Sequence, residues 1–228
     1  MGEPVLQLYN EISVNPGGLD LKDELEVLEG ACRAASRQIQ DTRDDGSIFV
    51  QRIAQPIGTR FAASLSDPNC NVRQHIIPEI VRLTVIVRFL NVPPSHTAHP
   101  IVELIKSSWQ LLDGASNRFP LDGVLAEKIC RLHKHALRSC GSTAYAPMLD
   151  ALIDQLIKSY ERSRQSPFLY AASICVTEYG RDPTYAQKLF DMASKLADTS
   201  FGFLRDLNDL VDSPDAVSYT HLTLPTKA

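Results

Sequence analysis

The chain has 228 residues, of which 44% are hydrophobic and 22% charged, a balance that is ordinary for a globular protein. Its formal net charge of −4 argues against general nucleic-acid binding through a basic surface. No apolar run approaches the roughly 18 residues of a transmembrane helix, and the opening MGEPVLQLYNE lacks the apolar centre of a signal peptide. The five cysteines show no CxxC or other metal-ligand spacing, so we expect buried thiols in a reducing compartment.

The first half of the chain is predicted to be a series of helices. Apolar periodicity places them at residues 4–13, 20–41, 47–65 and 72–90. Pro56 lies inside the third helix and is expected to bend or break it. The fourth helix is apolar almost all round, which predicts that it is sandwiched between neighbouring helices.

The second half continues the pattern after a proline-rich loop, NVPPSHTAHP. Further helices are predicted at residues 100–114, 122–141, 146–161, 167–179 and 183–211. Trp109 falls on the apolar side of the first of these and is expected to pack between successive repeats. Ser166 is predicted to cap a helix with Pro167 at its first position, and Asp182 to start the last helix in the same way. Gly202 is the candidate break within that last helix.

The predicted helices come in pairs with short connections. Alternate helices begin near residues 20, 72, 122 and 167, so the period is roughly 45 to 50 residues, close to that of HEAT and armadillo repeats. No strand pair or Asn-Gly hairpin signal is found. We therefore expect an all-α fold, a HEAT/armadillo-like helical-repeat solenoid, with an irregular helical bundle of similar size as the alternative.

The helix predicted at residues 122–141 carries the clearest candidate site. Lys128, Arg131, Lys134 and Arg138 are spaced by three, three and four, so at about 100° per residue they share one broad face, with His135 on its flank. Cations at this spacing repel one another on a helix, and the stretch contains only two acids. The pattern predicts a ligand with negative charges at matching intervals, whereas the plainer interpretation is a solvated, Lys/Arg-rich helix surface.

The histidines and carboxylates do not form a recognisable catalytic or metal site. His133 and His135 are two residues apart, so on a helix they point to different sides, and His96 and His99 have no Cys or acid at ligand spacing. No phosphate-binding glycine loop, nucleophile elbow or acid/base pair is found. We therefore expect neither an enzyme nor a cofactor, with an enzyme whose site escapes sequence reasoning as the remaining alternative.

Three stretches carry a family resemblance: HPIVELIKSSWQLL, GVLAEKICRLHKHALRSCG and YAPMLDALIDQLIKSYERSRQSPFLYAASICVTEYG. They resemble the C-terminal half of the transportin-SR family of importin-beta-type nuclear import receptors, and FLYxxSIxVxEYG is the most specific part. The resemblance covers residues 76–217 and is weaker but collinear before that. The related importin-13 family is the alternative.

The resemblance implies a superhelix of HEAT repeats that binds cargo, crosses the nuclear pore past nucleoporins, and releases the cargo when Ran-GTP binds. Family cargo is the arginine-serine-rich (SR) domain of splicing factors, often phosphorylated, which an arginine-rich helix binds. That helix corresponds to residues 122–140, and its cargo-binding cations match the following positions: Lys128, Arg131, Lys134 and Arg138, with His135 beside them. A further family arginine falls on Val124, and the two lysines supply charge without a bidentate fork.

The resemblance also implies a domain organisation and a localisation. Residues 1–217 are expected to be HEAT-like repeats of a longer solenoid, whose Ran-contacting N-terminal repeats are absent here. Residues 218–228, SYTHLTLPTKA, do not continue the family pattern and resemble a cloning-adaptor-derived or disordered tail. The expected location is nucleus and cytoplasm, with shuttling, and neither direct nucleic-acid binding nor a membrane is implied. A generic HEAT scaffold for some other protein partner is the further alternative.

Overall fold

The computed structural model describes residues 19–42, 46–92 and 99–211. The predicted helix at 4–13, most of the proline-rich loop and the predicted tail at 218–228 lie outside these residues. The described helices are α2 (Leu21–Thr42), α3 (Ser47–Ser66), the π-helical turn η1 (Val72–Ile76), α4 (Ile77–Phe89), α5 (Pro100–Arg118), α6 (Gly123–Ser163), α7 (Ser166–Tyr179) and α8 (Pro183–Val211).

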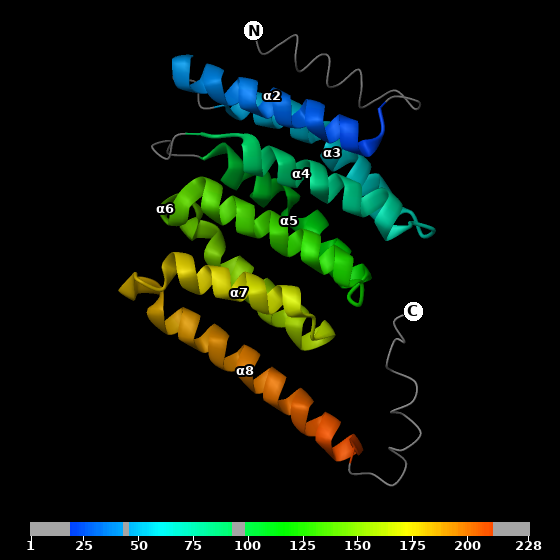
Figure 1. Ribbon diagram of the computed structural model, residues 1–228, viewed down its shortest axis with the longest axis vertical. Helices are drawn as coiled ribbons and strands as arrows, with labels where there is room; N and C mark the ends of the chain where they lie inside the picture. The colour runs from blue at the N-terminus through cyan, green and yellow to red at the C-terminus, as the bar shows by residue number, and fades with distance from the viewer. Residues whose placement is uncertain (1–18, 43–45, 93–98, 212–228) are drawn as a thin grey trace, which may run out of the picture.

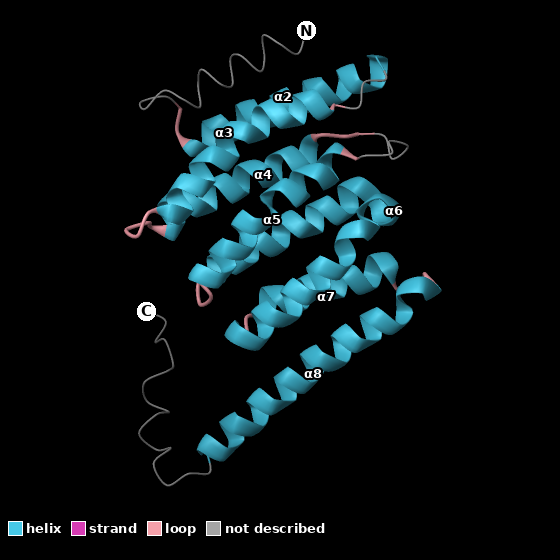
Figure 2. Ribbon diagram, turned by 180° about the vertical axis from the view of Figure 1, so that it is seen from behind, coloured by secondary structure: helices cyan, strands magenta, loops and turns pink. Residues whose placement is uncertain are grey.

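These helices stack along the long axis of the molecule from α2 to α8 (Figure 1). Helices and loops are the only elements of the described residues, which contain no strand (Figure 2). The fold is therefore an all-α helical-repeat solenoid, as predicted. The pairs begin at residues 21, 72, 123 and 166, next to the starts that the sequence period predicts.

Within the described residues the helices form two rows. The first row is α2, η1–α4, residues 123–140 of α6, and α7, and the second row is α3, α5, residues 142–163 of α6, and α8. Neighbouring helices of the first row run parallel and in register, as two ion pairs show. Arg73 at the start of η1 pairs with Asp122 at the start of α6, and Arg138 near the end of the first half of α6 pairs with Glu178 near the end of α7. Each repeat therefore presents equivalent positions at similar heights on one surface.

The two halves of α6 meet at Gly141 without a connecting loop. Gly141 has φ 74° and ψ 163°, a backbone conformation that is essentially restricted to glycine. The second half of α6 packs along α5, where the hydroxyl oxygen of Ser159 lies 3.4 Å from that of Ser116. The sequence predicts two separate helices here, which is correct, but it starts the second one several residues too late.

Burial explains why this order is stable. α4 packs against α2 on one side and α6 on the other, which confirms the sandwiched position predicted from its apolar surface. The ring of Trp109 on α5 packs at 5.4 Å from that of His133 on α6, so it bridges successive repeats as predicted. Four of the cysteines are buried and only Cys70 is partly exposed, and all five are free thiols.

Three local predictions are wrong. Of the predicted bend or break at Pro56, the break does not occur, because Ile53 and Ile57 on either side are fully buried and hold both turns in the core. α8 continues through Gly202, where a single glycine costs only about 1 kcal/mol. Ser166 is the first helical residue of α7 rather than its cap, since Gln165 occupies the cap position without a side-chain bond.

Candidate functional site

The candidate site lies on the first half of α6, which a capping residue and an apolar stripe hold in place. Asp122 caps the helix, because its Oδ1 accepts hydrogen bonds from the backbone N–H groups of Val124 at 3.0 Å and Leu125 at 2.9 Å. An apolar stripe at helical spacing then faces the core and consists of Leu125, Ile129, Leu132, Ala136 and Cys140. The cations are thereby turned away from the core, as the helical period requires.

The structure exposes the predicted cations unequally. The side chains of Arg131 and Arg138 are 54% and 52% exposed, whereas that of Lys128 is only 24% exposed. Lys134 and His135 are half-buried. The two arginines are therefore the most accessible of the four predicted cations.

Two of the cations line a hollow of about 400 Å³ between α6 and the start of α7. Lys134 Nζ lies 5.4 Å from the centre of the Tyr170 ring, a cation–π contact that holds the ammonium group at the rim. The lining residues are Glu127, Cys130, Arg131, Lys134, Ser166, Pro167 and Tyr170. Lys128, Arg138 and His135 are not among them, so the structure brings only part of the predicted set together in this hollow.

Acidic neighbours partly offset the cations. Glu127 lies 3.7 Å from Lys128 and 3.4 Å from Arg131, and Glu178 of α7 lies 3.8 Å from Arg138. Ion pairs this exposed contribute about 0–1 kcal/mol each, so an anion with more charge can replace them. The arrangement is suited to binding an anion and releasing it again.

His135 lies on the side of the cation surface that is next to α4, away from the hollow beside α7. Burial, followed by the positive charges of Arg88 and of three cations on its own helix, lowers the pKa of His135 to about 4. The imidazole is therefore neutral at pH 7 and is not a fifth cation. Protonation becomes easier only where an anion compensates the surrounding charge.

Sequence reasoning missed two contributors from other helices. Tyr170 lies within the most specific family motif, but nothing in the sequence assigns its ring to Lys134. Arg88 ends α4, and only the parallel register of the first row places its charge beside His135. Both contacts depend on packing between repeats, which spacing along a single helix does not reveal.

Cys130 lines the hollow, but its thiol is unreactive there. Burial raises the pKa of its thiol far above the usual range, with a smaller contribution from Cys175. The thiolate, which is the reactive form, is therefore negligible at pH 7. The hollow does not provide a nucleophile at this position.

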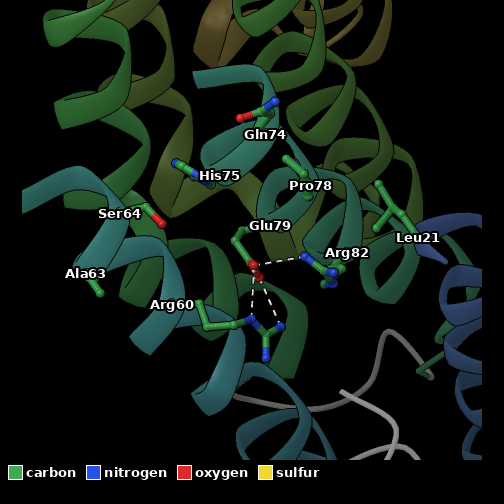
Figure 3. A pocket seen from close by; sticks show the side chains of 9 residues that line it. All are labelled: Leu21, Arg60, Ala63, Ser64, Gln74, His75, Pro78, Glu79 and Arg82. Atoms are coloured by element: carbon green, nitrogen blue, oxygen red, sulfur yellow. Dashed lines mark hydrogen bonds and ion pairs between the residues drawn. The ribbon is translucent and has the colours of Figure 1, made fainter. Parts of the chain in front are cut away.

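A second hollow, of about 480 Å³, lies between α2, α3 and α4 (Figure 3). Arg60 donates to both oxygens of Glu79 at 3.0 Å, and Arg82 donates to Glu79 at 2.8 Å and to Glu24 at 2.8 Å. These two arginines and two glutamates compensate one another. The network joins three helices and leaves no excess charge for a ligand, so its role is structural.

Within the described residues, no group of three or more His, Cys, Asp or Glu side chains is arranged to hold a metal ion. None of the described helices combines the length and the apolar character needed to cross a membrane.

Comparison with known proteins agrees with this architecture. Residues 99–204, a little under half of the chain, match the family model described as the fourth TPR domain of transportin-3 and importin-13. TPR and HEAT repeats are both stacked helix pairs, so this description agrees with the observed solenoid. The matched residues include α5, α6, α7 and most of α8, and hence the whole hollow beside α6.

A curated relative matches a similar length of chain. It is an uncharacterized protein of Schizosaccharomyces pombe, 27% identical over 99 residues, which are 43% of this chain and 10% of that protein. The chain thus matches about a tenth of the relative's length. Over residues 99–204 the cation-bearing solenoid is thus similar to the transportin-3/importin-13 family, and the match does not favour one of the two.

Proposed function

We propose that the chain is part of a nuclear import receptor and that the α6 cations bind phosphorylated arginine-serine-rich segments of its cargo. The observation that carries the proposal is the hollow in which Arg131 and Lys134 converge beside Tyr170. The similarity of residues 99–204 to the transportin-3/importin-13 family supports it, because the match includes this hollow. We propose that the chain binds cargo rather than catalyses a reaction, and that the receptor shuttles between nucleus and cytoplasm.

The chemistry of the site suits a phosphate group. A phosphoserine carries a charge of about −1.5 to −2 at pH 7 and three acceptor oxygens. Arg131 can present a fork of N–H donors to two of these oxygens, and Lys134 adds a point charge at the rim. The phosphate then replaces Glu127 as the partner of Arg131, since the carboxylate carries less charge and its ion pair is exposed.

The remaining predicted residues act around this centre. Arg138 and Lys128 lie one to two turns away on the same helix and meet neighbouring anions of the same peptide. His135 offers a neutral ring that gains a proton when an anion approaches. In the complete receptor, contact with nucleoporins carries the cargo through the pore, and binding of Ran-GTP at other repeats releases it.

The direct test is a titration of phosphorylated and unphosphorylated arginine-serine peptides against wild type and the Arg131→Glu/Arg138→Glu variant. Wild type is expected to prefer the phosphorylated peptide by at least tenfold, and this preference falls with added salt because exposed charges carry it. The double variant is expected to lose the preference while keeping its helical circular dichroism.

Equal affinities across all four combinations would reduce the helix to a solvated surface. The matched control is Lys158→Glu/Lys195→Glu, which changes the net charge equally but on exposed positions of the second row. It is expected to bind like wild type. An importin-13-like receptor is the second candidate, because the matching family model covers both families, and it is favoured if wild type shows no phosphate preference.

A further inference from the structure

Two more arginines lie on the first row, next to the α6 cations. The guanidinium carbons of Arg33 on α2 and of Arg88 on α4 are each 4.7 Å from the centre of the Phe89 ring. We infer that the cation surface continues from α6 across α4 to α2, and that Arg88 and Arg33 bind further phosphates of the same peptide. This inference rests on the proposed function and extends its site to a longer ligand.

The position of Arg33 is fixed by the way α2 holds the end of α4. The hydroxyl of Ser36 accepts a hydrogen bond from the N–H of Asn91 at 2.8 Å and lies 3.2 Å from the carbonyl oxygen of Phe89. Arg33 is one turn earlier on the same helix, so its head reaches the Phe89 ring. Stacking on the ring leaves the in-plane N–H donors of the guanidinium unblocked, and two of its nitrogens contact the exposed carboxylate of Glu29, which a more highly charged anion can replace.

Arg88 connects this pair to α6. It lies in the last turn of α4, which packs against α6, and its positive charge is among those that lower the pKa of His135. Within the described ranges no carboxylate is ion-paired with Arg88, and its described contact is the one with Phe89. Arg33 has one acidic partner, Glu29 at 2.8 Å, in an exposed pair of the weak kind.

The two neighbours of α6 differ in charge. α7 contains no lysine or arginine, and its Glu178 is paired with Arg138. Within the helices of the first row, further cations therefore come from α4 and α2 rather than from α7. Electrostatic attraction therefore favours a phosphorylated peptide that runs from the hollow across α4 rather than across α7.

Dimensions set the ligand length. Neighbouring helix axes are about 8–10 Å apart, so α2 lies on the order of 20 Å from α6. An extended chain advances about 3.3–3.6 Å per residue, so about six residues span this distance. In a four-residue peptide of alternating arginine and phosphoserine the two phosphates lie about 7 Å apart, less than the distance between neighbouring helix axes, so they reach the α6 cations alone. A peptide of twelve residues can cover all three helices.

The experiment compares two synthetic peptides of alternating arginine and phosphoserine, four and twelve residues long, by titration against the full chain. In the Arg33→Glu/Arg88→Glu variant the longer peptide is expected to bind at least tenfold more weakly than in wild type. The shorter peptide is expected to change less than twofold. Arg33→Gln/Arg88→Gln removes the two charges without reversing them. It is expected to give the same pattern with a smaller loss of affinity. Lys158→Glu/Lys195→Glu again serves as the control for net charge.

The outcomes separate this inference from the proposed function. If the shorter peptide binds wild type and the longer one is insensitive to Arg33 and Arg88, the cation surface ends at α6 and the inference is wrong. If neither peptide binds wild type, the proposed function fails and the inference with it. An equal loss in the control variant also overturns the inference, because only bulk charge is then at work. A twelve-nucleotide single-stranded RNA with the same sensitivity to these arginines would assign the surface to nucleic acid.

Discussion

Nδ1 of His133 lies 3.1 Å from the hydroxyl oxygen of Tyr145, and this contact joins the two halves of α6 across Gly141. Both side chains are almost completely buried. Because α6 has no connecting loop, this hydrogen bond is one of the few polar links that fix the second half against the first.

Tyr145→Phe is expected to lower the free energy of unfolding by about 1–3 kcal/mol, since it leaves a buried imidazole nitrogen without its hydrogen bond. Urea denaturation followed by circular dichroism measures the change. Tyr170→Phe is the control, because Tyr170 is exposed and removal of its hydroxyl is expected to change stability by less than about 0.5 kcal/mol. Similar losses in the two variants would contradict the role given to the Tyr145 hydroxyl.

Stability is expected to fall below neutral pH. Burial lowers the pKa of His133 from 6.5 to about 4, so the unfolded chain binds more protons than the folded one between these values. Stability is therefore fully present above pH 6.5 and is lost as the pH falls toward 4. Between pH 7 and 5 the loss through His133 is on the order of 2 kcal/mol.

His135 adds a loss of the same sign, because its pKa is lowered as well. His133→Gln is thus expected to reduce the slope of stability against pH between 7 and 5, and His133→Gln/His135→Gln to remove most of it. Urea denaturation at four pH values measures both. A slope unchanged in the double variant would show that other groups govern the acid response.

Gly141→Ala is expected to destabilise the fold by about 1–3 kcal/mol. A Cβ at Gly141 meets no atom within 4 Å, so the cost comes from the backbone conformation alone. Gly30→Ala is the matched control, since Gly30 is exposed inside α2 and a Cβ there is also unobstructed. That substitution is expected to stabilise by about 0.5–1 kcal/mol, because alanine favours the helix. Changes of the same sign in the two melting curves would argue against the strained turn.

Glu79→Gln is expected to cost about 3–5 kcal/mol, because it leaves Arg60 and Arg82 without their shared carboxylate in a largely buried site. Glu103→Gln breaks the exposed pair with Lys106 and is expected to cost less than about 1 kcal/mol. Chemical denaturation of both variants gives the comparison. A small loss for Glu79→Gln would mean that water already screens the network.

Binding of a phosphopeptide is expected to raise the pKa of His135 from about 4 toward its ordinary value, because phosphate charge offsets the surrounding cations. The charged groups that lower it are Arg88 of α4 and Arg131, Lys134 and Arg138 of α6. NMR titration of the His135 ring with and without peptide measures the shift. A peptide that binds without moving this titration occupies another surface.

The sequence predicts the repeat architecture well because helix pairing depends on local periodicity. The apolar stripe of α6 and the Asp182 cap, whose Oδ1 accepts from the N–H of Thr184 at 2.9 Å, follow directly from residue types at fixed spacing. The predictions that fail concern single residues in continuous helices, such as Pro56 and Gly202. At Pro56 tertiary packing outweighs a local preference of a few kcal/mol, whereas the cost of about 1 kcal/mol at Gly202 is too small to end the helix.

The candidate site is predictable only in part for the same reason. Helical spacing identifies the cations of α6, but their unequal exposure depends on α7 and α4. Lys128 is largely covered, whereas Arg131 reaches the hollow that Tyr170 completes. Cargo binding by these residues stays a prediction, and the titrations above are its test.

The parallel register of the first row makes its surface a two-dimensional grid. A cation moved by one helical turn shifts about 5.4 Å along the helix axis, whereas a cation moved to the next repeat shifts about 8–10 Å across it. Phosphates at alternate residues of a peptide recur about every 7 Å. A few substitutions on the exposed grid positions can therefore retune which spacing of negative charges is bound, while the buried stripe that holds the solenoid together stays unchanged.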